Sequence, residues 1–161
     1  MRFWQYNLLG LLLAGISLPA AAVSVSASTD WSNCQASDSI TDAGDYYTGS
    51  LESGSALLSC TDAYLTISGT ATSTTAWTLS ARLVSSATGL GLELKRTGNG
   101  TGSSAPSGGT DYTTLSTAYE TLFTGQGNVS SIPLQFRVNN LDISDGNGTK
   151  NIQIQYQITT Q

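Results

Sequence analysis

Residues 151–158 read Asn-Ile-Gln-Ile-Gln-Tyr-Gln-Ile, an uninterrupted alternation of polar and apolar side chains. In an extended strand, this period of two places the glutamines on one face and the apolar side chains on the other: Ile152, Ile154, Tyr156 and Ile158. A strand with a single apolar face is half buried, as strands of antiparallel sheets are. This stretch therefore predicts an all-β protein.

Three runs upstream show the same alternation: residues 77–83, 90–95 and 132–138. Residues 85–89 suit a hairpin between the first two runs, and the turn signal Asp145-Gly-Asn-Gly148 predicts a second hairpin, between the third run and the terminal strand. Short strands separated by turn signals at intervals of roughly ten residues predict an antiparallel β-sandwich, either Ig-like or jelly-roll-like. We expect the apolar faces of these strands to form its core.

Two segments depart from this pattern. Residues 97–110 are rich in Gly and Ser and predict a flexible loop, because nothing apolar pins them. Beyond them, apolar side chains recur at spacings of three and four residues: Leu115, Ala118, Tyr119, Leu122 and Phe123. That stripe predicts one short helix near 114–124.

Length and charge limit the classes of protein. The chain has 161 residues, which suggests one domain, and its formal net charge is −5. Its few Lys and Arg residues do not cluster. Nucleic-acid binding and binding to an anionic membrane both need clustered basic side chains, so the composition excludes both partner classes.

Residues 1–22 have the order of a secretory signal peptide: a basic Arg2, an apolar stretch at 8–18, Pro19 and the small residues Ala20-Ala-Ala22. The apolar stretch is too short for a stable membrane span, and an N-terminal membrane anchor is the alternative. Cleavage after Ala22 leaves a single secreted domain, residues 23–161; Ala27 ends a second candidate site. We expect the mature chain, without a membrane span, outside the cell or at its surface, after periplasmic transit if the cell is Gram-negative.

The chain contains two cysteines, Cys34 and Cys60. In an exported chain, an even pair predicts one disulfide bond. Two thiols without His and without C-x-x-C spacing fit neither a zinc site nor a redox motif.

The sequence offers no catalytic constellation. His is absent, so a nucleophilic triad lacks its usual base. Neither Lys95 nor Lys150 lies in a recognisable serine motif, and the acidic residues lie mostly in polar stretches. We therefore expect a protein that is not an enzyme and that requires neither a metal nor another cofactor.

Two weak binding signals remain. Oxygen-bearing side chains resemble the start of a calcium loop, although a hairpin turn explains the same residues: Asp142, Asp145, Asn147 and Thr149. Five aromatic side chains suit either a sugar-stacking platform or ordinary core and rim packing: Trp31, Tyr46, Tyr47, Tyr64 and Tyr112.

The run Val-Ser-Val-Ser-Ala at 23–27 places Val23, Val25 and Ala27 on one face of a strand. It has no charge or proline, the usual protections of a sheet edge. The run therefore predicts a strand that either donates itself to an open sheet edge of another subunit or folds back as the first strand of its own domain.

The layout of the chain resembles that of bacterial pilin-like secreted β-sandwiches, namely chaperone–usher fimbrial subunits and the spore coat U type. The shared features are the signal segment, the short alternating run at 23–28, an early Cys34 that could pair with Cys60, and the clean alternating terminal strand. The resemblance covers most of the mature chain. It implies an Ig-like sandwich that builds surface filaments and has no catalytic residues.

The sequence thus predicts an extracellular structural subunit of a surface filament, coat or pilus-like assembly. Its partners would be copies of itself or other surface subunits, and N-terminal strand donation is one candidate route of assembly. The alternative is a secreted carbohydrate-binding or adhesive β-sandwich module, with a carbohydrate as its ligand.

Overall fold

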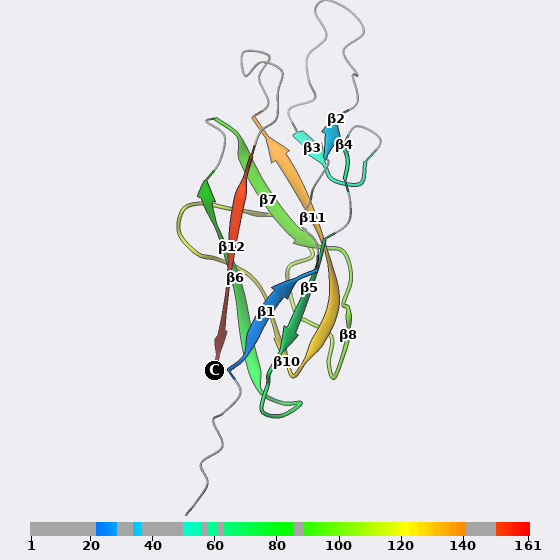
Figure 1. Cartoon of the computed structure of the whole chain (residues 1–161), viewed down its shortest axis with the longest axis vertical. Helices are drawn as coiled ribbons and strands as arrows, with labels where there is room; N and C mark the ends of the chain where they lie inside the picture. The colour runs from blue at the N-terminus through cyan, green and yellow to red at the C-terminus, as the bar shows by residue number, and fades with distance from the viewer. Residues whose placement is uncertain are drawn as a thin grey trace, which may run out of the picture.

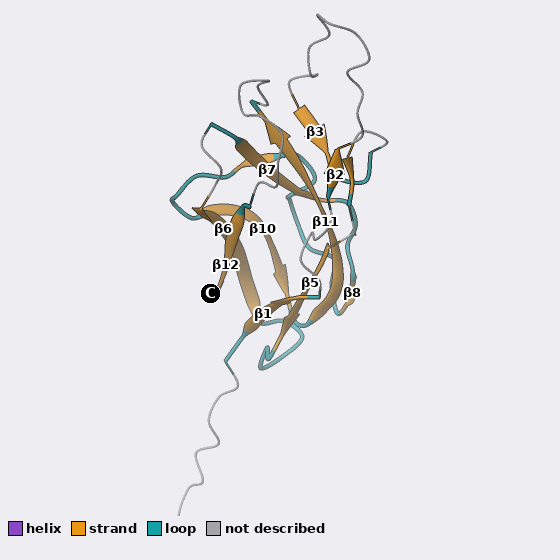
Figure 2. Ribbon diagram, turned by 45° about the horizontal axis from the view of Figure 1, so that its top comes forward, coloured by secondary structure: helices purple, strands orange, loops and turns teal. Residues whose placement is uncertain are grey.

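The computed structural model describes residues 22–28, 34–36, 50–55, 58–60, 63–85, 89–140 and 151–161. Within these residues the chain consists of strands, turns and loops, as Figure 2 shows. All strand pairs among them are antiparallel. The predicted all-β class is therefore confirmed. The predicted signal segment, apart from Ala22, lies outside the described residues.

The strands form two large sheets and one small one (Figure 1). Side by side in the first sheet are β1 (Ser24–Ala27), β5 (Ala63–Ser68), β11 (Val129–Asn139), β7 (Gly91–Arg96) and β9 (Thr113–Thr114), with β3 (Ser50–Glu52) and β8 (Thr101–Gly102) also paired to β11. The second sheet has the order β10 (Glu120–Gln126), β6 (Ala76–Ser85), β12 (Gln153–Thr160). The small sheet pairs β2 (Gln35–Ala36) with β4 (Leu58–Ser59).

Buried side chains of both large sheets belong to one hydrophobic cluster. Those that are at most 2% exposed come from the first sheet (Leu65, Ile67, Leu94, Val129 and Ile132) and from the second (Trp77, Leu79, Ala81 and Phe123). The inward residues of β6 (Trp77, Leu79 and Ala81), β7 (Leu92 and Leu94) and β11 (Ile132, Leu134, Phe136 and Val138) alternate and lie in this cluster, so the alternation in the sequence assigned the faces of these strands correctly.

Trp77 shows how closely the second sheet is packed. Its side chain is fully buried, and its Nε1 donates a hydrogen bond to the carbonyl oxygen of Gly127 at 2.8 Å. The ring lies against the backbone of β10 at Gly125, where an added Cβ would overlap the six-membered part of the indole. Gly125 therefore provides the space for the indole ring, and only a residue without a side chain fits there.

Both predicted hairpins are wrong. β6 belongs to the second sheet and β7 to the first, and β11 and β12 are separated in the same way. Since both sheets contribute to one cluster, the apolar face of a strand is buried equally well in either sheet. Alternation in the sequence therefore identified the strands but not the sheet to which each belongs.

The predicted helix near 114–124 is also wrong, because the segment contains β9, a turn and β10. Leu115 is buried in the turn, and its N–H bonds to the carbonyl oxygen of Leu92 at 2.8 Å. Leu122 and Phe123 are both buried because the register of β10 on β6 shifts between Thr121 and Phe123. A bulge and a buried turn residue together imitate the spacing of a helical stripe.

The Gly- and Ser-rich residues 97–110 are held in place by Arg96, which is only 7% exposed. Its guanidinium donates to the carbonyl oxygens of Gly98, Pro106 and Gly108 and to Oδ1 of Asn99, at 2.5 to 3.3 Å. The predicted flexible loop rested on the absence of apolar anchors, and it did not take account of these polar bonds. A buried arginine with several carbonyl acceptors orders a loop that has almost no apolar side chains.

The two large sheets lie next to each other along two borders, and the contacts differ from one border to the other. On one border, residues 97–110 connect the sheets: β8 pairs with β11, and Ser107 exchanges two backbone hydrogen bonds with Thr124 of β10 at 2.8 and 3.0 Å. We call residues 97–110 the loop side. On the other border, β1 and β12 are the outer strands of their sheets and lie next to each other, and we call this pair the strand side.

Candidate assembly edge

The predicted donor strand is β1, and it folds back onto β5 of its own chain. The register places Val25 opposite Ile67. Just beyond the strand, the N–H of Ser28 bonds to the carbonyl oxygen of Tyr64 at 2.9 Å. Of the two arrangements that the sequence left open, the structure contains the intramolecular one.

The attachment of β1 to the core is slight. Val23 and Val25 are half-buried and pack against the hydrophobic cluster, whereas Ala27 is exposed. With four residues, β1 is half the length of β12, which has eight. Few contacts would therefore be lost if β1 separated from β5.

Gly69 lets the chain before β1 approach β5. Its φ is +78°, a conformation that favours glycine, and an added Cβ would lie 2.5 Å from the carbonyl oxygen of Ala22. Ala22 is the residue after which the signal peptide is predicted to be cut. The backbone of β1 thus begins to pack at the first predicted cleavage point.

β12 is the outer strand of the second sheet, and its inward side chains are incompletely covered. Ile154, Tyr156 and Ile158 are half-buried, although the residues opposite Tyr156 and Ile158 on β6, Ala81 and Leu79, are fully buried. Figure 1 shows the C-terminal end of β12 beside the start of β1. Because β1 is short, it reaches only part of the apolar row of β12.

The backbone of β12 bonds to β6 through alternate residues. The N–H of Gln161, which follows the strand, donates to the carbonyl oxygen of Ala76 at 3.1 Å. In an antiparallel ladder the hydrogen-bonded pairs recur every second residue, so the backbone groups of Gln155, Gln157 and Thr159 also point to β6. Those of Ile154, Ile158 and Thr160 point outward, where no described strand pairs with them.

The outward side chains of β12 are uncharged. Gln153, Gln155 and Gln157 are exposed, and Oε1 of Gln155 accepts two hydrogen bonds from Arg82 of β6, at 2.9 and 2.8 Å. The strand contains neither a charge nor a proline. The alternation of residues 151–158 predicts an ordinary core strand; the absence of charge and proline that marks residues 23–27 as a candidate donor strand is found in β12 as well.

The predicted disulfide is confirmed. Cys34 is bonded to Cys60, with their Cα atoms 4.3 Å apart. The bond connects the small sheet, because Cys34 directly precedes β2 and Cys60 directly follows β4. It also ties the segment that follows β1 to the segment that precedes β5.

The predicted sugar platform is described only at Tyr64 and Tyr112, since Trp31, Tyr46 and Tyr47 lie outside the described residues. Tyr64 is in β5 and Tyr112 directly precedes β9, three strand spacings away, which is about 14 Å across the first sheet. Lys95 Nζ and Arg137 Cζ lie 4.2 and 4.1 Å from the centroid of the Tyr112 ring. The structure does not bring these two rings together, and two cations occupy the space over one of them.

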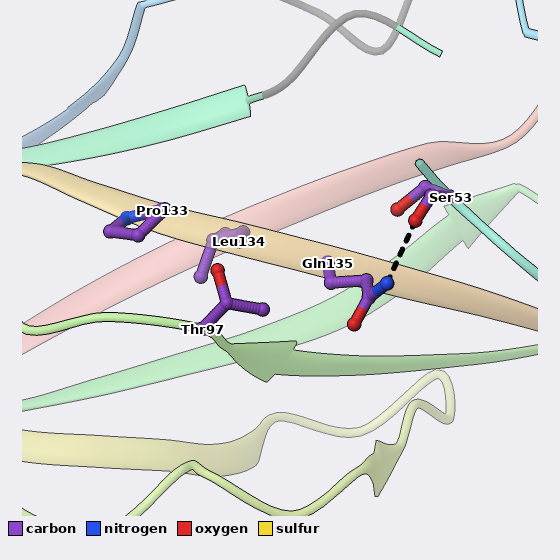
Figure 3. A pocket seen from close by; sticks show the side chains of 5 residues that line it. All are labelled: Ser53, Thr97, Pro133, Leu134 and Gln135. Carbon is purple, nitrogen blue, oxygen red and sulfur yellow. Dashed lines mark hydrogen bonds between the residues drawn. The ribbon is translucent and has the colours of Figure 1, made fainter. Parts of the chain in front are cut away.

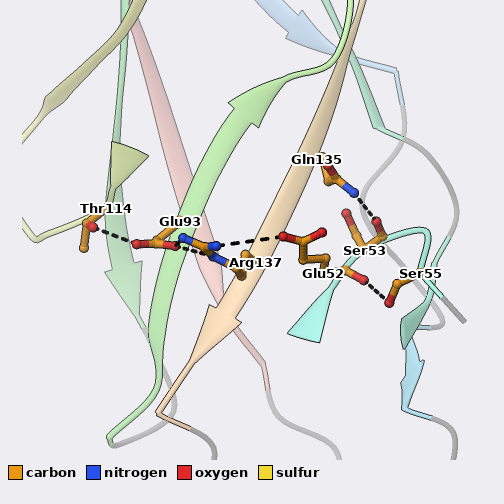
Figure 4. A network of polar contacts seen from close by, with 7 residues as sticks. All are labelled: Glu52, Ser53, Ser55, Glu93, Thr114, Gln135 and Arg137. Carbon is orange, nitrogen blue, oxygen red and sulfur yellow. Dashed lines mark hydrogen bonds and ion pairs between the residues drawn. The ribbon is translucent and has the colours of Figure 1, made fainter. Parts of the chain in front are cut away.

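Arg137, which lies over the Tyr112 ring, also takes part in a polar network on the outer face of the first sheet, which Figure 4 shows without Tyr112. Arg137 of β11 is its centre: it bonds to Glu93 of β7 at 2.6 Å and lies 3.9 Å from Glu52 of β3. Thr114 of β9 donates to the other oxygen of Glu93 at 3.1 Å. The network therefore connects four strands of the first sheet.

Glu93 of this network and the neighbouring Tyr112 have shifted pKa values. Burial would raise the pKa of Glu93, but side-chain hydrogen bonds from Asn139, Arg137 and Thr114 outweigh burial, so its pKa lies below 4.5. Burial, followed by the negative charge of Glu52, raises the pKa of Tyr112 to about 12. Both groups thus keep their ordinary charge at neutral pH, and the network is a structural connection.

A hollow of about 150 Å³ lies on the first sheet, lined by Ser53, Thr97, Pro133, Leu134 and Gln135 (Figure 3). Gln135 Nε2 donates to the carbonyl oxygen of Ser53 at 2.8 Å across it. None of the five lining residues carries a charge or a base. The hollow offers hydroxyl and amide groups but nothing that would activate a nucleophile.

The four predicted calcium residues, Asp142, Asp145, Asn147 and Thr149, lie outside the described residues, so this site stays a prediction. None of the described residues forms a helix suited to spanning a membrane. Comparisons of the chain with protein-family models, curated proteins and solved structures yield no match.

Proposed function

We propose that this protein is an extracellular structural subunit of a surface filament, coat or pilus-like assembly, built on two sheets packed as a β-sandwich. The observation that carries this proposal is the strand side. There β1 and β12, both without charge or proline, are neighbouring outer strands, and no described strand covers their outer edges. Soluble proteins usually protect such edges, because an open edge pairs with other chains.

The route of assembly predicted from the sequence, strand donation by residues 23–27, takes a specific form here. Because β1 already pairs with β5 in its own chain, donation means exchange: β1 leaves β5 of one copy and occupies the same place in the next. The exchanged strand remakes the pairs that it lost, so the net cost is small. The slight attachment of β1 supports this route.

The test compares the full mature chain with a chain that begins at Ser28. N-terminal sequencing of the exported protein first establishes whether Val23 is retained, since cleavage after Ala27 would remove all of β1 and end the exchange route. If Val23 is retained, we expect polymers from the full chain and their loss from a shortened chain that stays folded. A full chain that remains monomeric at high concentration, or a shortened chain that simply unfolds, counts against the proposal.

A further inference from the structure

In a mature chain that begins at Val23, strand β1 is joined to the rest of the protein at its C-terminal end alone. It can therefore leave β5 without pulling another segment through the fold. Residues 28–33 connect it to Cys34, the next residue that is fixed covalently. The length of this connection, which we call the tether, decides how far β1 can move once it separates from β5.

The far end of the tether is fixed close to the place where β1 is bound. Cys34 is bonded to Cys60, which lies just before β5. In the antiparallel register, Ala27 at the end of β1 lies opposite Leu65 near that same end of β5. The disulfide therefore connects the two strands through residues 28–34 and 60–62 and makes a shortcut past residues 35–59.

The disulfide limits the reach of β1. The seven Cα–Cα steps from Ala27 to Cys34 span at most about 25 Å in any conformation. Without the bond, only the two-residue pairing of β2 with β4 would hold this segment before β3, which begins at Ser50. The connection from Ala27 to Ser50 can span up to about 80 Å.

A short tether also favours pairing within one chain. The effective concentration of a tethered segment at its own site falls roughly as the −3/2 power of the tether length. The tether has six residues, whereas twenty-two separate β1 from β3. By this relation the disulfide raises the effective concentration of β1 at its own β5 about sevenfold. The slight packing of β1 is thus supplemented by a covalent restraint.

We propose that the Cys34–Cys60 disulfide governs strand exchange. It keeps β1 on β5 of its own chain, and it restricts exchange to a second copy whose β5 lies within about 30 Å of Cys34 of the donor. This inference rests on the proposed function, because it names what regulates the exchange and how near the exchanging copies must lie. A chain whose disulfide has not formed exchanges β1 more readily and over a longer distance.

The first experiment lengthens the tether and leaves the disulfide in place. An insert of about sixteen Gly and Ser residues between Thr29 and Asp30, in a chain that begins at Val23, gives a flexible tether about as long as the connection to β3. We expect the hydrogen-exchange protection of the Ser28 amide, which bonds to Tyr64, to fall about sevenfold in dilute monomeric protein. This measurement does not depend on assembly.

Two controls separate tether length from overall stability. The same insert between Ala43 and Gly44 lies beyond Cys34 and leaves the tether unchanged, so Ser28 should stay as protected as in the wild type. The Leu115 amide, which bonds to β7, should keep its protection in both variants. Equal protection of Ser28 in the two variants, or an equal loss at Ser28 and Leu115 in the first, overturns the inference.

The double variant C34S/C60S removes the bond itself. We expect the same loss of protection at Ser28, with Leu115 still protected as evidence that the chain is folded. If this variant unfolds, the insertion variants decide the question, because they keep the disulfide.

Sedimentation of the same variants measures the exchange. With the insert before Cys34, polymers should appear at a concentration about sevenfold lower than in the wild type, and with the insert after Cys34 at the wild-type concentration. Polymers that form at the same concentration from both insertion variants overturn the inference and leave the proposed function standing. Loss of Ser28 protection without polymers from any variant confirms that the disulfide holds β1 and counts against the proposed function, because the released strand finds no second copy.

Discussion

The second sheet has two outer strands, and they end in different surroundings. At β10 the outer backbone bonds to Ser107, and the chain of residues 97–110 continues from there to β11, held by the buried Arg96. At β12 no described strand covers the outer backbone, and the neighbouring β1 is short and slightly attached. The loop side thus joins the two sheets, whereas on the strand side no described strand covers the outer edges of β1 and β12.

The two borders are therefore held by different kinds of interaction. A loop of Gly and Ser residues contributes little apolar burial, so the loop side depends on directed polar bonds to a buried charge. The strand side has regular backbone groups and apolar side chains, and no described strand closes it. The contacts of the loop side stabilise the single chain, whereas the strand side depends on the short β1.

The largest expected effect comes from a substitution that removes the hydrogen bonds of the loop side. Arg96→Met keeps the apolar stem but removes every guanidinium donor, which leaves loop carbonyls without their partner. We expect the free energy of unfolding to fall by about 3 kcal/mol in urea titration, because each unpaired, partly buried acceptor costs about 1–3 kcal/mol. Arg82→Met is the control, since the hydrogen bonds of Arg82 go to the exposed Gln155, and should cost less than about 1 kcal/mol. Equal effects would show that Arg96 does not hold the loop.

A second change adds one methyl group beneath Trp77. Gly125→Ala drives a Cβ into a fully buried ring that has no room to move. We expect a loss of about 2–3 kcal/mol, the range for overpacking a tight core. Near-UV circular dichroism should also change, because the indole must shift. An unchanged spectrum with unchanged stability would mean that the ring is more adaptable than its burial indicates.

The same methyl group on the strand side should act differently. In a chain that retains Ala22, the new Cβ of Gly69→Ala meets the carbonyl oxygen of Ala22, which can move away with β1, so we expect a global loss of about 1–2 kcal/mol, mostly from backbone strain. Hydrogen exchange of the Ser28 amide should accelerate as β1 detaches. Gly54→Ala has nearly the same φ and open space around it, so it measures the strain alone and should leave Ser28 protected. Equal exchange in both variants would contradict a loosely attached β1.

The smallest expected effect is a loss of stability in acid that acts near Glu93 and leaves the strand side unchanged. The pKa of Glu93 is lowered in the folded chain, so its contribution to stability is present above pH 4.5 and is lost as the pH falls through the lower folded value. Since Glu93 binds Thr114 of β9, acid should weaken protection of the Leu115 amide, which bonds to Leu92, at a cost of about 1 kcal/mol or less. Glu93→Gln should remove this pH dependence. If acid instead weakened the hydrogen-exchange protection of the Ser28 amide, the acid-sensitive contact would lie on the strand side, which would contradict this prediction.

The sequence predicted strands well because alternation reflects burial directly. Residues 77–83, 90–95 and 132–138 became β6, β7 and β11 with the expected faces inward. The pairing of Cys34 with Cys60 followed from their number and context. Each of these inferences needs only a local pattern, and local patterns are present in a single chain.

The predictions that were wrong concern contacts between residues far apart in the sequence. The sheet to which β7 or β12 belongs is decided by packing across the core, which alternation does not record. The false helix arose because a bulge at Leu122 and Phe123 combined with a buried turn residue to give spacings of three and four. Arg96 was overlooked because its acceptors are mostly backbone carbonyls, which every sequence contains. The strand at residues 23–27 was predicted, but its pairing with β5 rather than with a neighbouring subunit is a tertiary property.

The pairing of β12 with β6 has a consequence for the order in which the protein can fold. Residues 77–85 are made long before residues 153–160, so the central strand of the second sheet waits for a partner about seventy positions away. Such distant contacts slow folding, because a large loop must close before they form. Until then β6 presents to its surroundings the edge that β12 will later cover. A nascent chain would therefore be most prone to wrong pairing before residues 153–160 are made, and an escort that shields β6 in that interval would raise its yield.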